Sequence, residues 1–326
     1  MAQPQTATAT ATPIPTPSPS GVDCSALLSE GDVSALIGST VGTVDPNLAA
    51  GSGKKFGWLS SYAIEAVQGA NCVWGEPGTE WVATYGARDE PVFALQALPH
   101  AQEAWTMLRP KGGTPGAAYA GGESFGGDCA DGKCHTDVLV GSWWLSAIAV
   151  SPKGTMTERA FHDEVQKAVT ALGTLPEPDA VSVDNAIADA CGTDPYTAAV
   201  TQSFGVPRAS FYGREFQFGI ESAVKIGTAT GGCNYQPSVD GSGGFLTSAW
   251  VIPDGQRLFG ELAHLAGQKA SVTEFGRTTA NDNSDTSTFE YYALVGNDWV
   301  TIYALPGPDA RLHSKAFVDW LRSTYA

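Results

Sequence analysis

Two halves of this 326-residue chain contain matching segments in the same order. The clearest match pairs LVGSWWLSAIAV, from Leu139 to Val150, with LVGNDWVTIYAL, from Leu294 to Leu305. Further matching segments begin at Cys24 and Cys191, Trp58 and Phe218, Leu98 and Ile252, and Glu158 and Ser314. The spacing between partners changes only slowly along the chain. We therefore predict two copies of one fold rather than two unrelated domains.

The duplication divides the chain into predicted parts. Residues 1–23 form a disordered tether rich in Thr, Pro and Ser. Residues 24–174 form the first α+β repeat, 175–183 a linker, and 184–326 the second α+β repeat. The linker contains prolines and acidic residues, which is typical of an exposed connection between domains. The chain length also agrees with two domains of about 150 residues each.

Each copy is predicted to be α+β, with flanking helices on a mostly antiparallel sheet. In the first copy, Ser29 is placed to cap a helix that ends at Gly38, and Asp32 occupies the capping-box position. A second helix covers 101–108, where apolar residues follow the i, i+3, i+4, i+7 pattern. A third begins at Thr157 and ends at Gly173.

The predicted strands lie between these helices, and the one at 81–85 has the alternating character of a strand. They cover 62–67, the segment around Cys72 and Trp74, 81–85, 117–120, 138–140 and 143–150. The second copy repeats the order. Helices that alternate with groups of strands are typical of α+β folds.

Six cysteines in a Lys-poor chain predict disulfides formed in an oxidising compartment. Many pairings of six cysteines are possible, but the duplication selects among them, because equivalent cysteines should form equivalent bridges. This predicts one bridge per repeat and one extra bridge in the first copy: Cys24–Cys72, Cys191–Cys233 and Cys129–Cys134.

The charge balance argues against two classes of partner. The chain carries 34 acidic and 18 basic residues, a formal net charge of −16. Nucleic acids and anionic membrane surfaces both attract Lys- and Arg-rich surfaces, so neither is an expected partner. With 43% hydrophobic residues, the chain can fill a sizeable core.

The N-terminal composition favours export. Residues 1–22 carry no charge, and 6–21 change from Thr/Ala to Pro/Ser, a composition typical of extended spacers between an exported protein and its anchor. The sequence contains no stretch that predicts a transmembrane segment, and no signal peptide is visible. We expect an extracellular or cell-envelope location and a signal peptide in the natural precursor. A lipid anchor in that precursor is an open alternative.

One short motif suggests a nucleophile. The segment GESFG, from Gly122 to Gly126, matches G-x-S-x-G, in which a strained turn exposes a serine hydroxyl beside an oxyanion hole. Ser124 is therefore a candidate catalytic residue of a serine hydrolase. No apolar helix follows the motif, however, and a flexible strand end is the alternative. The candidate bases, none in a recognisable triad order, are His100, His135, His162, His264 and His313.

The segment from Asp128 to Asp137, DCADGKCHTD, is a candidate metal-binding or redox loop. Cys129, Cys134 and His135 supply three local ligands, whereas structural zinc takes four. Redox thiol pairs favour the shorter C-x-x-C spacing. A disulfide that closes a hairpin is the alternative. We expect no cofactor, because the sequence contains no phosphate-binding or dinucleotide-binding motif.

Tryptophan positions suggest one further contact. Trp144 and Trp299 occupy matching positions in the two copies, so both are assigned to the core. Trp143 corresponds to Asp298, and neighbours on a strand point to opposite faces. Trp143 is therefore a candidate binding residue for a partner or ligand, with packing between the two copies as the alternative.

The start of the first copy, CSALLSEGDVSALIG from Cys24 to Gly38, with the later Cys72-Val-Trp74, resembles a family of actinobacterial secreted lipoproteins of unknown function. Members open with Cys-x-Leu-Leu-Thr-x-x-(Asp/Glu)-Val, end that helix at Gly, and carry a later Cys-x-(Trp/Tyr). The second copy matches less well, because its start at Cys191 lacks the Leu-Leu pair. The resemblance implies a cell-envelope location and a small disulfide-bonded α+β domain, and it supplies no catalytic residues.

These observations favour a non-enzymatic, exported binding or accessory protein whose ligand is an unknown protein or small molecule. A secreted serine hydrolase that uses Ser124 is one alternative. A metal-binding protein that uses the Asp128–Asp137 loop is the other. Convergence of His, Asp and Ser side chains within hydrogen-bonding reach in one pocket would count against the first interpretation.

Overall fold

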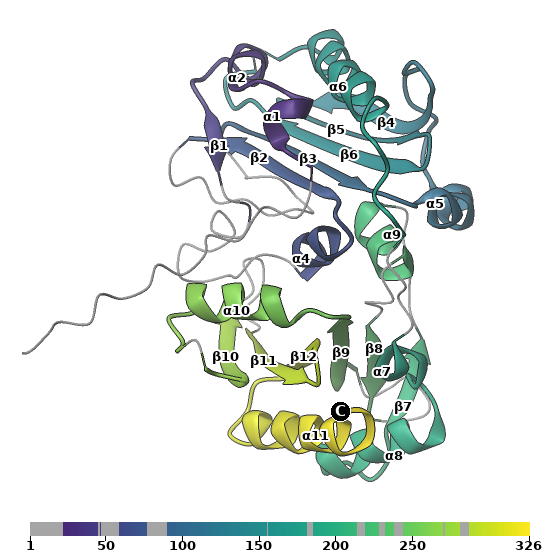
Figure 1. Cartoon of the computed structure of the whole chain (residues 1–326), viewed down its shortest axis with the longest axis vertical. Helices are drawn as coiled ribbons and strands as arrows, with labels where there is room; N and C mark the ends of the chain where they lie inside the picture. Colours follow the sequence, from purple (N-terminus) through teal and green to yellow (C-terminus); the bar gives the residue numbers. More distant parts are fainter. Residues whose placement is uncertain are drawn as a thin grey trace, which may run out of the picture.

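The computed structural model shows an α+β protein with two six-stranded antiparallel sheets (Figure 1). The structure describes residues 22–44, 46, 59–76, 90–154, 156–180, 185–213, 219–227, 232–237, 244–269, 271–280 and 287–326. Most of the predicted tether, the predicted strand at 81–85 and part of the predicted linker lie outside the described residues.

The same succession of helices and strands occurs twice. The first half contains α1 (Cys24–Leu27), α2 (Glu30–Ile37), β1 (Gly42–Val44), α4 (Leu59–Ala66), β2 (Ala70–Gly75), β3 (Val92–Leu98), α5 (Gln102–Leu108), a short 3-10 helix (Arg109–Lys111), β4 (Gly122–Ala130), β5 (Lys133–Val140), β6 (Trp143–Val150) and α6 (Glu158–Leu172). The second half contains α7 (Ala186–Asp189), α8 (Asp194–Ser203), β7 (Ser210–Gly213), α9 (Ile220–Gly227), β8 (Cys233–Gln236), β9 (Thr247–Ile252), α10 (Gln256–Leu265), β10 (Glu274–Ala280), β11 (Ser287–Val295), β12 (Asp298–Ala304) and α11 (Ala310–Tyr325).

The two sheets have corresponding strand orders. The order is β1-β2-β3-β6-β5-β4 in the first sheet and β7-β8-β9-β12-β11-β10 in the second, with neighbouring strands antiparallel. Strands therefore correspond one by one, from β1 with β7 to β6 with β12. This correspondence allows each position of one sheet to be compared with its equivalent in the other.

The sequence predicted the outer-face helices α2 and α6 correctly. The Ser29 hydroxyl accepts from the Asp32 amide at 3.1 Å at the start of α2, and Gly38 ends that helix with a left-handed φ of 75°. Thr157 caps α6 by accepting from the Ala160 amide at 3.2 Å. In α2 the predicted apolar face is buried: Val33, Leu36 and Ile37.

Two predicted strands were wrong. The segment 62–67 belongs mainly to helix α4, and 117–120 contains only an isolated bridge at Tyr119. After α4, the chain turns at Gln68, with a φ of 60°, and at Gly69. A Cβ at Gly69 would lie 2.5 Å from the Ala97 carbonyl oxygen, so this turn packs tightly against β3.

The helices form three layers around the two sheets (Figure 1). Helices α1, α2 and α6 cover the outer face of the first sheet, and α8 and α11 cover the outer face of the second. Helices α4 and α9 lie between the two sheets and contact each other. Each sheet thus has an outer face covered by its own half and an inner face turned toward the other half.

Both central helices contact the other half of the chain. Helix α9, from the second half, packs against α5, β3 and β6 of the first half, and helix α4 of the first half contacts β9 of the second. The Tyr62 ring of α4 lies edge-on to the Trp299 ring, with ring centroids 5.0 Å apart. The two halves therefore share one layer of helices, so each inner face is buried partly by the other half.

Side-chain sizes in this shared layer are complementary. Each inner face carries an equivalent aromatic cluster: Trp105, Phe125 and Trp144 in the first half, and Phe259, Phe275 and Trp299 in the second. The position of Tyr62 in α4 corresponds to Ala223 in α9. The cluster with the larger Trp105 is covered by the small Ala223, and the cluster with the smaller Phe259 is covered by Tyr62. Close packing explains this compensation, because cores tolerate changes of shape best when the total volume is kept.

All six cysteines are in disulfides, and the three predicted pairings are present: Cys24–Cys72, Cys129–Cys134 and Cys191–Cys233. No helix within the described ranges has the length and hydropathy needed to cross a lipid bilayer.

Candidate functional site

Ser124 lies inside strand β4, not on a turn between a strand and a helix. It is 5% exposed, and its hydroxyl donates a hydrogen bond to the Ala117 carbonyl oxygen. Backbone packs closely around it, since a Cβ at Gly116 would lie 2.6 Å from the Ser124 hydroxyl oxygen. This setting lacks the exposed hydroxyl that a nucleophile elbow provides.

The predicted metal or redox loop is part of the β4–β5 hairpin. Cys129 and Cys134 face each other in the strand register and form a disulfide, as in the alternative interpretation. Both sulfurs are therefore unavailable as thiolate ligands. Across the part of the chain that the structure describes, no group of three His, Cys, Asp or Glu side chains is arranged to hold a metal ion.

Trp143 and Trp144 point to opposite faces of the first sheet. Trp143 is 4% exposed and packs in the hydrophobic cluster beneath α6, on the outer face. Trp144 is fully buried on the inner face, against the shared helix layer. This placement differs from the sequence interpretation, because the residue that contacts the other half is Trp144. Trp143 is buried within its own half.

The structure does bring a His, an Asp and a Ser together on the inner face of the first sheet. Nε2 of His135 lies 3.1 Å from an Asp137 oxygen and 3.3 Å from the Ser146 hydroxyl. The other Asp137 oxygen accepts from the Trp144 indole at 2.7 Å. Burial would lower the pKa of His135, but the Asp137 charge and hydrogen bond outweigh burial and raise that pKa.

This cluster does not have the geometry of a catalytic triad. In a triad, the carboxylate holds one imidazole nitrogen and the nucleophile binds the other. Here the Asp137 carboxylate and the Ser146 hydroxyl both lie next to Nε2 of His135. Asp137 therefore does not hold one ring nitrogen while the other accepts a proton from Ser146. The cluster instead pairs the buried carboxylate of Asp137, which is 2% exposed, with two hydrogen-bond donors.

A different set of polar side chains crosses the second sheet. Strand register places one residue from each of five neighbouring strands in a single row, on the inner face: Asn234, Ser248, Tyr303, Glu290 and Arg277. We call these five residues the polar row. Ser248 is buried, and the other four keep part of their surface exposed. Trp250, which is also partly exposed, follows Ser248 on the same face of β9.

The equivalent row of the first sheet is mostly apolar. Val73, Ala94 and Ile148 occupy the positions of Asn234, Ser248 and Tyr303, and His135 occupies that of Glu290. These three apolar residues belong to one small hydrophobic cluster, in which Val73 is fully buried. Equivalent sheet positions are thus mostly apolar in the first copy and polar in the second.

Two aromatic rings form a corner beside the polar row. The Trp250 and Tyr303 rings are 6.2 Å apart at an interplanar angle of 72°. The Trp250 indole donates to the Ser248 hydroxyl at 2.8 Å. Its ring lies against the backbone of Gly232, where a Cβ would be 3.0 Å from the indole atoms. The small residue at position 232 therefore leaves room for the indole.

At the other end of the row, the charges are balanced. Arg277 donates to Glu290 at 2.9 Å, and the Tyr292 hydroxyl donates to the same carboxylate oxygen. Burial, followed by the Glu290 charge, raises the pKa of both Tyr292 and Tyr303. Both phenols are therefore protonated at neutral pH and can donate hydrogen bonds.

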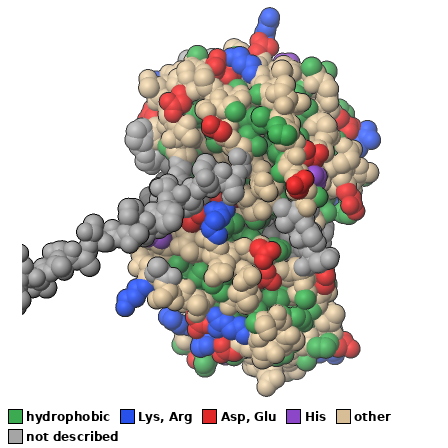
Figure 2. All heavy atoms as spheres, viewed as in Figure 1, with side chains coloured by type: hydrophobic (Ala, Val, Ile, Leu, Met, Phe, Trp, Pro, Cys, Tyr) green, Lys and Arg blue, Asp and Glu red, His purple; other side chains and the backbone are tan. Residues whose placement is uncertain are grey.

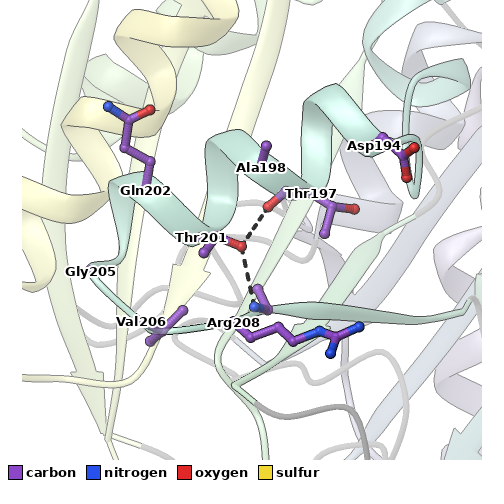
Figure 3. Close-up of a pocket in the computed structure, with 9 residues that line it drawn as sticks. Asp194, Thr197, Ala198, Thr201, Gln202, Gly205, Val206 and Arg208 are labelled. Atoms are coloured by element: carbon purple, nitrogen blue, oxygen red, sulfur yellow. Dashed lines mark hydrogen bonds between the residues drawn. The ribbon is translucent and has the colours of Figure 1, made fainter.

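Two hollows lie elsewhere, along helix α8. The first, with a volume of about 550 Å³, lies beside α8 and the chain that follows it, and Arg208 extends along its wall (Figure 3). The Thr201 hydroxyl on its wall already has two hydrogen-bond partners: it donates to the Thr197 carbonyl oxygen at 2.8 Å and accepts from the Ala209 amide at 3.2 Å. The second, of about 470 Å³, lies between α8 and α11 near Trp320. Both hollows are candidate ligand-binding sites in addition to the polar row.

The charged side chains on the face shown in Figure 2 do not indicate one kind of partner. On the face shown in Figure 2, acidic side chains are spread over both halves and basic ones are interspersed with them. Comparison with known proteins adds nothing to this picture, because no family model, curated protein or solved structure matches the chain.

Sequence reasoning named His135 as one of five candidate bases but missed its two partners and the polar row. A local signal exists for the pairing of His135 with Asp137, since residues two positions apart on a strand share a face. The polar row had no local signal, because its members come from five separate segments. Only strand register shows that they are neighbours.

Proposed function

We propose that this protein is an exported, non-enzymatic binding protein whose ligand is held by the polar row and Trp250 on the second sheet. One observation carries the proposal: the equivalent positions in the first sheet are mostly apolar, with Val73 and Ala94 buried, whereas those in the second sheet are polar, and all but Ser248 keep part of their surface exposed. The fold itself does not require polar residues there, because the first copy forms the same sheet without them. Polar groups retained at such positions are best explained by recognition of a ligand.

Export is supported by the disulfides. Three bridges and no free cysteine are typical of proteins that mature in an oxidising compartment. The absence of catalysis is supported by the hydrogen bonding of Ser124 and by the shared nitrogen of His135. Neither arrangement offers a nucleophile paired with an independent base.

The binding proposal can be tested by fluorine NMR on protein labelled with 5-fluorotryptophan. The chain contains nine tryptophans, and a Trp250→Phe variant assigns the Trp250 signal. Neutral oligosaccharides, short peptides and a soluble monoacyl lipid are added in turn. We expect at least one of these probes to shift the Trp250 signal while the signal of the fully buried Trp144 stays in place. Chromatography should recover the probe unchanged.

If no probe shifts the Trp250 signal, the polar row is not a binding site. If a probe shifts it and is then converted to product, the protein is an enzyme and the proposal is wrong.

The hydrolase alternative makes a separate prediction. A fluorophosphonate probe is expected to label the native protein no more than a Ser124→Ala variant, because the Ser124 hydroxyl is buried and already donates to Ala117. Labelling is read by mass spectrometry of the intact protein, with a known serine hydrolase as the positive control. Stoichiometric labelling that disappears in Ser124→Ala would make Ser124 a nucleophile after all.

A further inference from the structure

We infer that the hollow between helices α8 and α11 is a binding site for a small, neutral aromatic molecule. This hollow has a volume of about 470 Å³. Helices α8 and α11 cover the outer face of the second sheet (Figure 1), whereas the polar row lies on the inner face. The site is therefore separate from the polar row, and the inference does not rest on the proposed function.

In the first half, charged side chains close the equivalent place. Helices α2 and α6 of that half correspond to α8 and α11. The Lys167 ammonium on α6 lies 2.6 Å from an Asp32 oxygen on α2 and 3.0 Å from a Glu164 oxygen on α6. One cation thus joins the two helices, and the side chain of Glu164 is only 7% exposed.

The second half has uncharged residues at these positions. Gly38 and Gly205 follow the first helix of each pair in a left-handed conformation, with φ of 75° and 62°. Phe161 and Phe317 are both fully buried on the second helix of each pair. These matches align the three charged residues with three uncharged ones: Asp32 with Ala199, Glu164 with Trp320, and Lys167 with Ser323.

Open apolar surface accompanies this change. A Cβ at Gly205 would meet no atom within 4 Å, so the end of α8 leaves space beside it. Leu312, on the wall of the hollow, is 65% exposed, whereas its first-half equivalent Met156 is 8% exposed. Trp320 also lines the hollow and is partly exposed. Exposed apolar side chains that gather around a hollow are typical of a surface that a ligand covers.

The walls favour an uncharged ligand. Among the described residues that line the hollow, none is an Asp, Glu, Lys or Arg. An ionised ligand would lose water there without gaining an opposite carboxylate, ammonium or guanidinium group. The polar side chains on the walls are Gln202, Ser203 and His313, and none of them forms a hydrogen bond with another described residue. They can supply a donor or an acceptor to one polar group of a neutral ligand.

Trp320 favours an aromatic ligand. Its ring lies nearly parallel to the Phe317 ring, with 5.8 Å between centroids, and meets the Tyr196 and Tyr325 rings edge-on at 5.6 and 5.8 Å. These neighbours fix the indole before a ligand arrives, which lowers the entropic cost of binding. Aromatic pairs gain more free energy than their buried area alone supplies. An aromatic ligand should therefore bind better than an aliphatic one of similar size.

The extent of the apolar surface favours a small molecule over a protein. Leu312, Ala316 and Trp320 follow each other at intervals of four residues and so form one ridge of α11. The adjoining ridge is charged, with Lys315 and Asp319 paired at 2.8 Å. A specific protein interface usually buries about 800 Å² on each partner, which one ridge does not supply. The volume of the hollow, in contrast, falls in the range of roughly 300–1,000 Å³ that is usual for small-molecule sites.

Fluorescence titration of the whole protein with a matched pair of probes tests this inference. 1-Anilinonaphthalene is neutral, and 1-anilinonaphthalene-8-sulfonate has the same rings with one negative charge. 1-Decanol, which is neutral and aliphatic, is added as a competitor. We expect the neutral aromatic probe to bind at least about tenfold more tightly than the sulfonate. Decanol should displace it only at higher concentration than unlabelled naphthalene does.

Variants locate the site. Trp320→Leu should weaken binding of 1-anilinonaphthalene at least about tenfold, because it removes the aromatic wall. Ala316→Phe adds a ring at an exposed position on the wall and should weaken binding by filling the hollow. This second variant keeps the test valid if Trp320→Leu does not fold. Ala160→Phe is the matched control, because Ala160 is the exposed first-half equivalent of Ala316, and it should leave the affinity unchanged.

The fluorine NMR label used for the proposed function separates the two sites. Binding of 1-anilinonaphthalene should shift the Trp320 signal, which a Trp320→Phe variant assigns, and leave the Trp250 signal in place. The inference is overturned by a shift of the Trp250 signal alone, by equal affinities in Ala316→Phe and Ala160→Phe, or by no binding of the neutral probe. Tighter binding of the sulfonate or of decanol overturns the ligand class. The polar row is judged by its own test, so either proposal can fail while the other stands.

Discussion

Replacing Tyr62 with alanine should lower the free energy of unfolding by about 3–5 kcal/mol, the usual cost of removing a buried aromatic ring. The Tyr62 side chain is fully buried, and its ring lies 5.0 Å from the Trp299 ring of the other half. The surrounding side chains cannot close the resulting cavity easily, because they are held between two sheets. The measurement is urea unfolding followed by fluorescence and circular dichroism.

Two matched variants define the origin of this effect. Met107→Ala removes a side chain that is 50% exposed on the neighbouring helix α5, and it should change stability by no more than about 0.5 kcal/mol. Tyr62→Phe keeps the ring and should cost much less than Tyr62→Ala.

Because α4 and α9 lie in one layer shared by the two halves, the Tyr62→Ala variant should still unfold in a single transition at lower urea. Two separated transitions would show that the halves are stable independently of each other.

Removing the disulfides one at a time should give two large losses of stability and one smaller loss. The sequence separations are 48 for Cys24–Cys72, 42 for Cys191–Cys233 and 5 for Cys129–Cys134. A bridge that closes a longer loop restricts the unfolded chain more, which predicts about 4 kcal/mol for each long loop and about 2 kcal/mol for the short one.

Double Cys→Ala variants, compared by urea unfolding, measure these losses. The Cys129/Cys134 variant is the internal control, because it removes the same chemical groups but a much shorter loop. If it costs as much as either long-loop variant, loop closure is not the main source of the stabilisation.

The helix ends on the outer face of the first half could be predicted from local sequence. Ser29, Gly38 and Thr157 mark helix ends through capping groups that act within a few residues, and the structure confirms all three. The disulfides followed from a different kind of information, the duplication itself. Equivalent cysteines had to form equivalent bridges.

The shared layer could not be predicted from local sequence. The segment around Tyr62 was predicted to be a strand, but it is helical because α4 packs between two sheets, one of them distant in sequence. Tertiary contacts often decide the structure of such short apolar segments. The polar row escaped prediction for a related reason. Asn234 and Arg277 lie at its two ends, and their relation depends on four successive strand pairings.

The layer that α4 and α9 share has a consequence for how the two copies can change. Tyr62 and Ala223 have different sizes and pack against different clusters, so the two halves are not interchangeable, and removing either half would uncover part of the inner face of the other. A truncated chain that keeps only one half is therefore expected to expose apolar surface, because part of each inner face is covered by the other half.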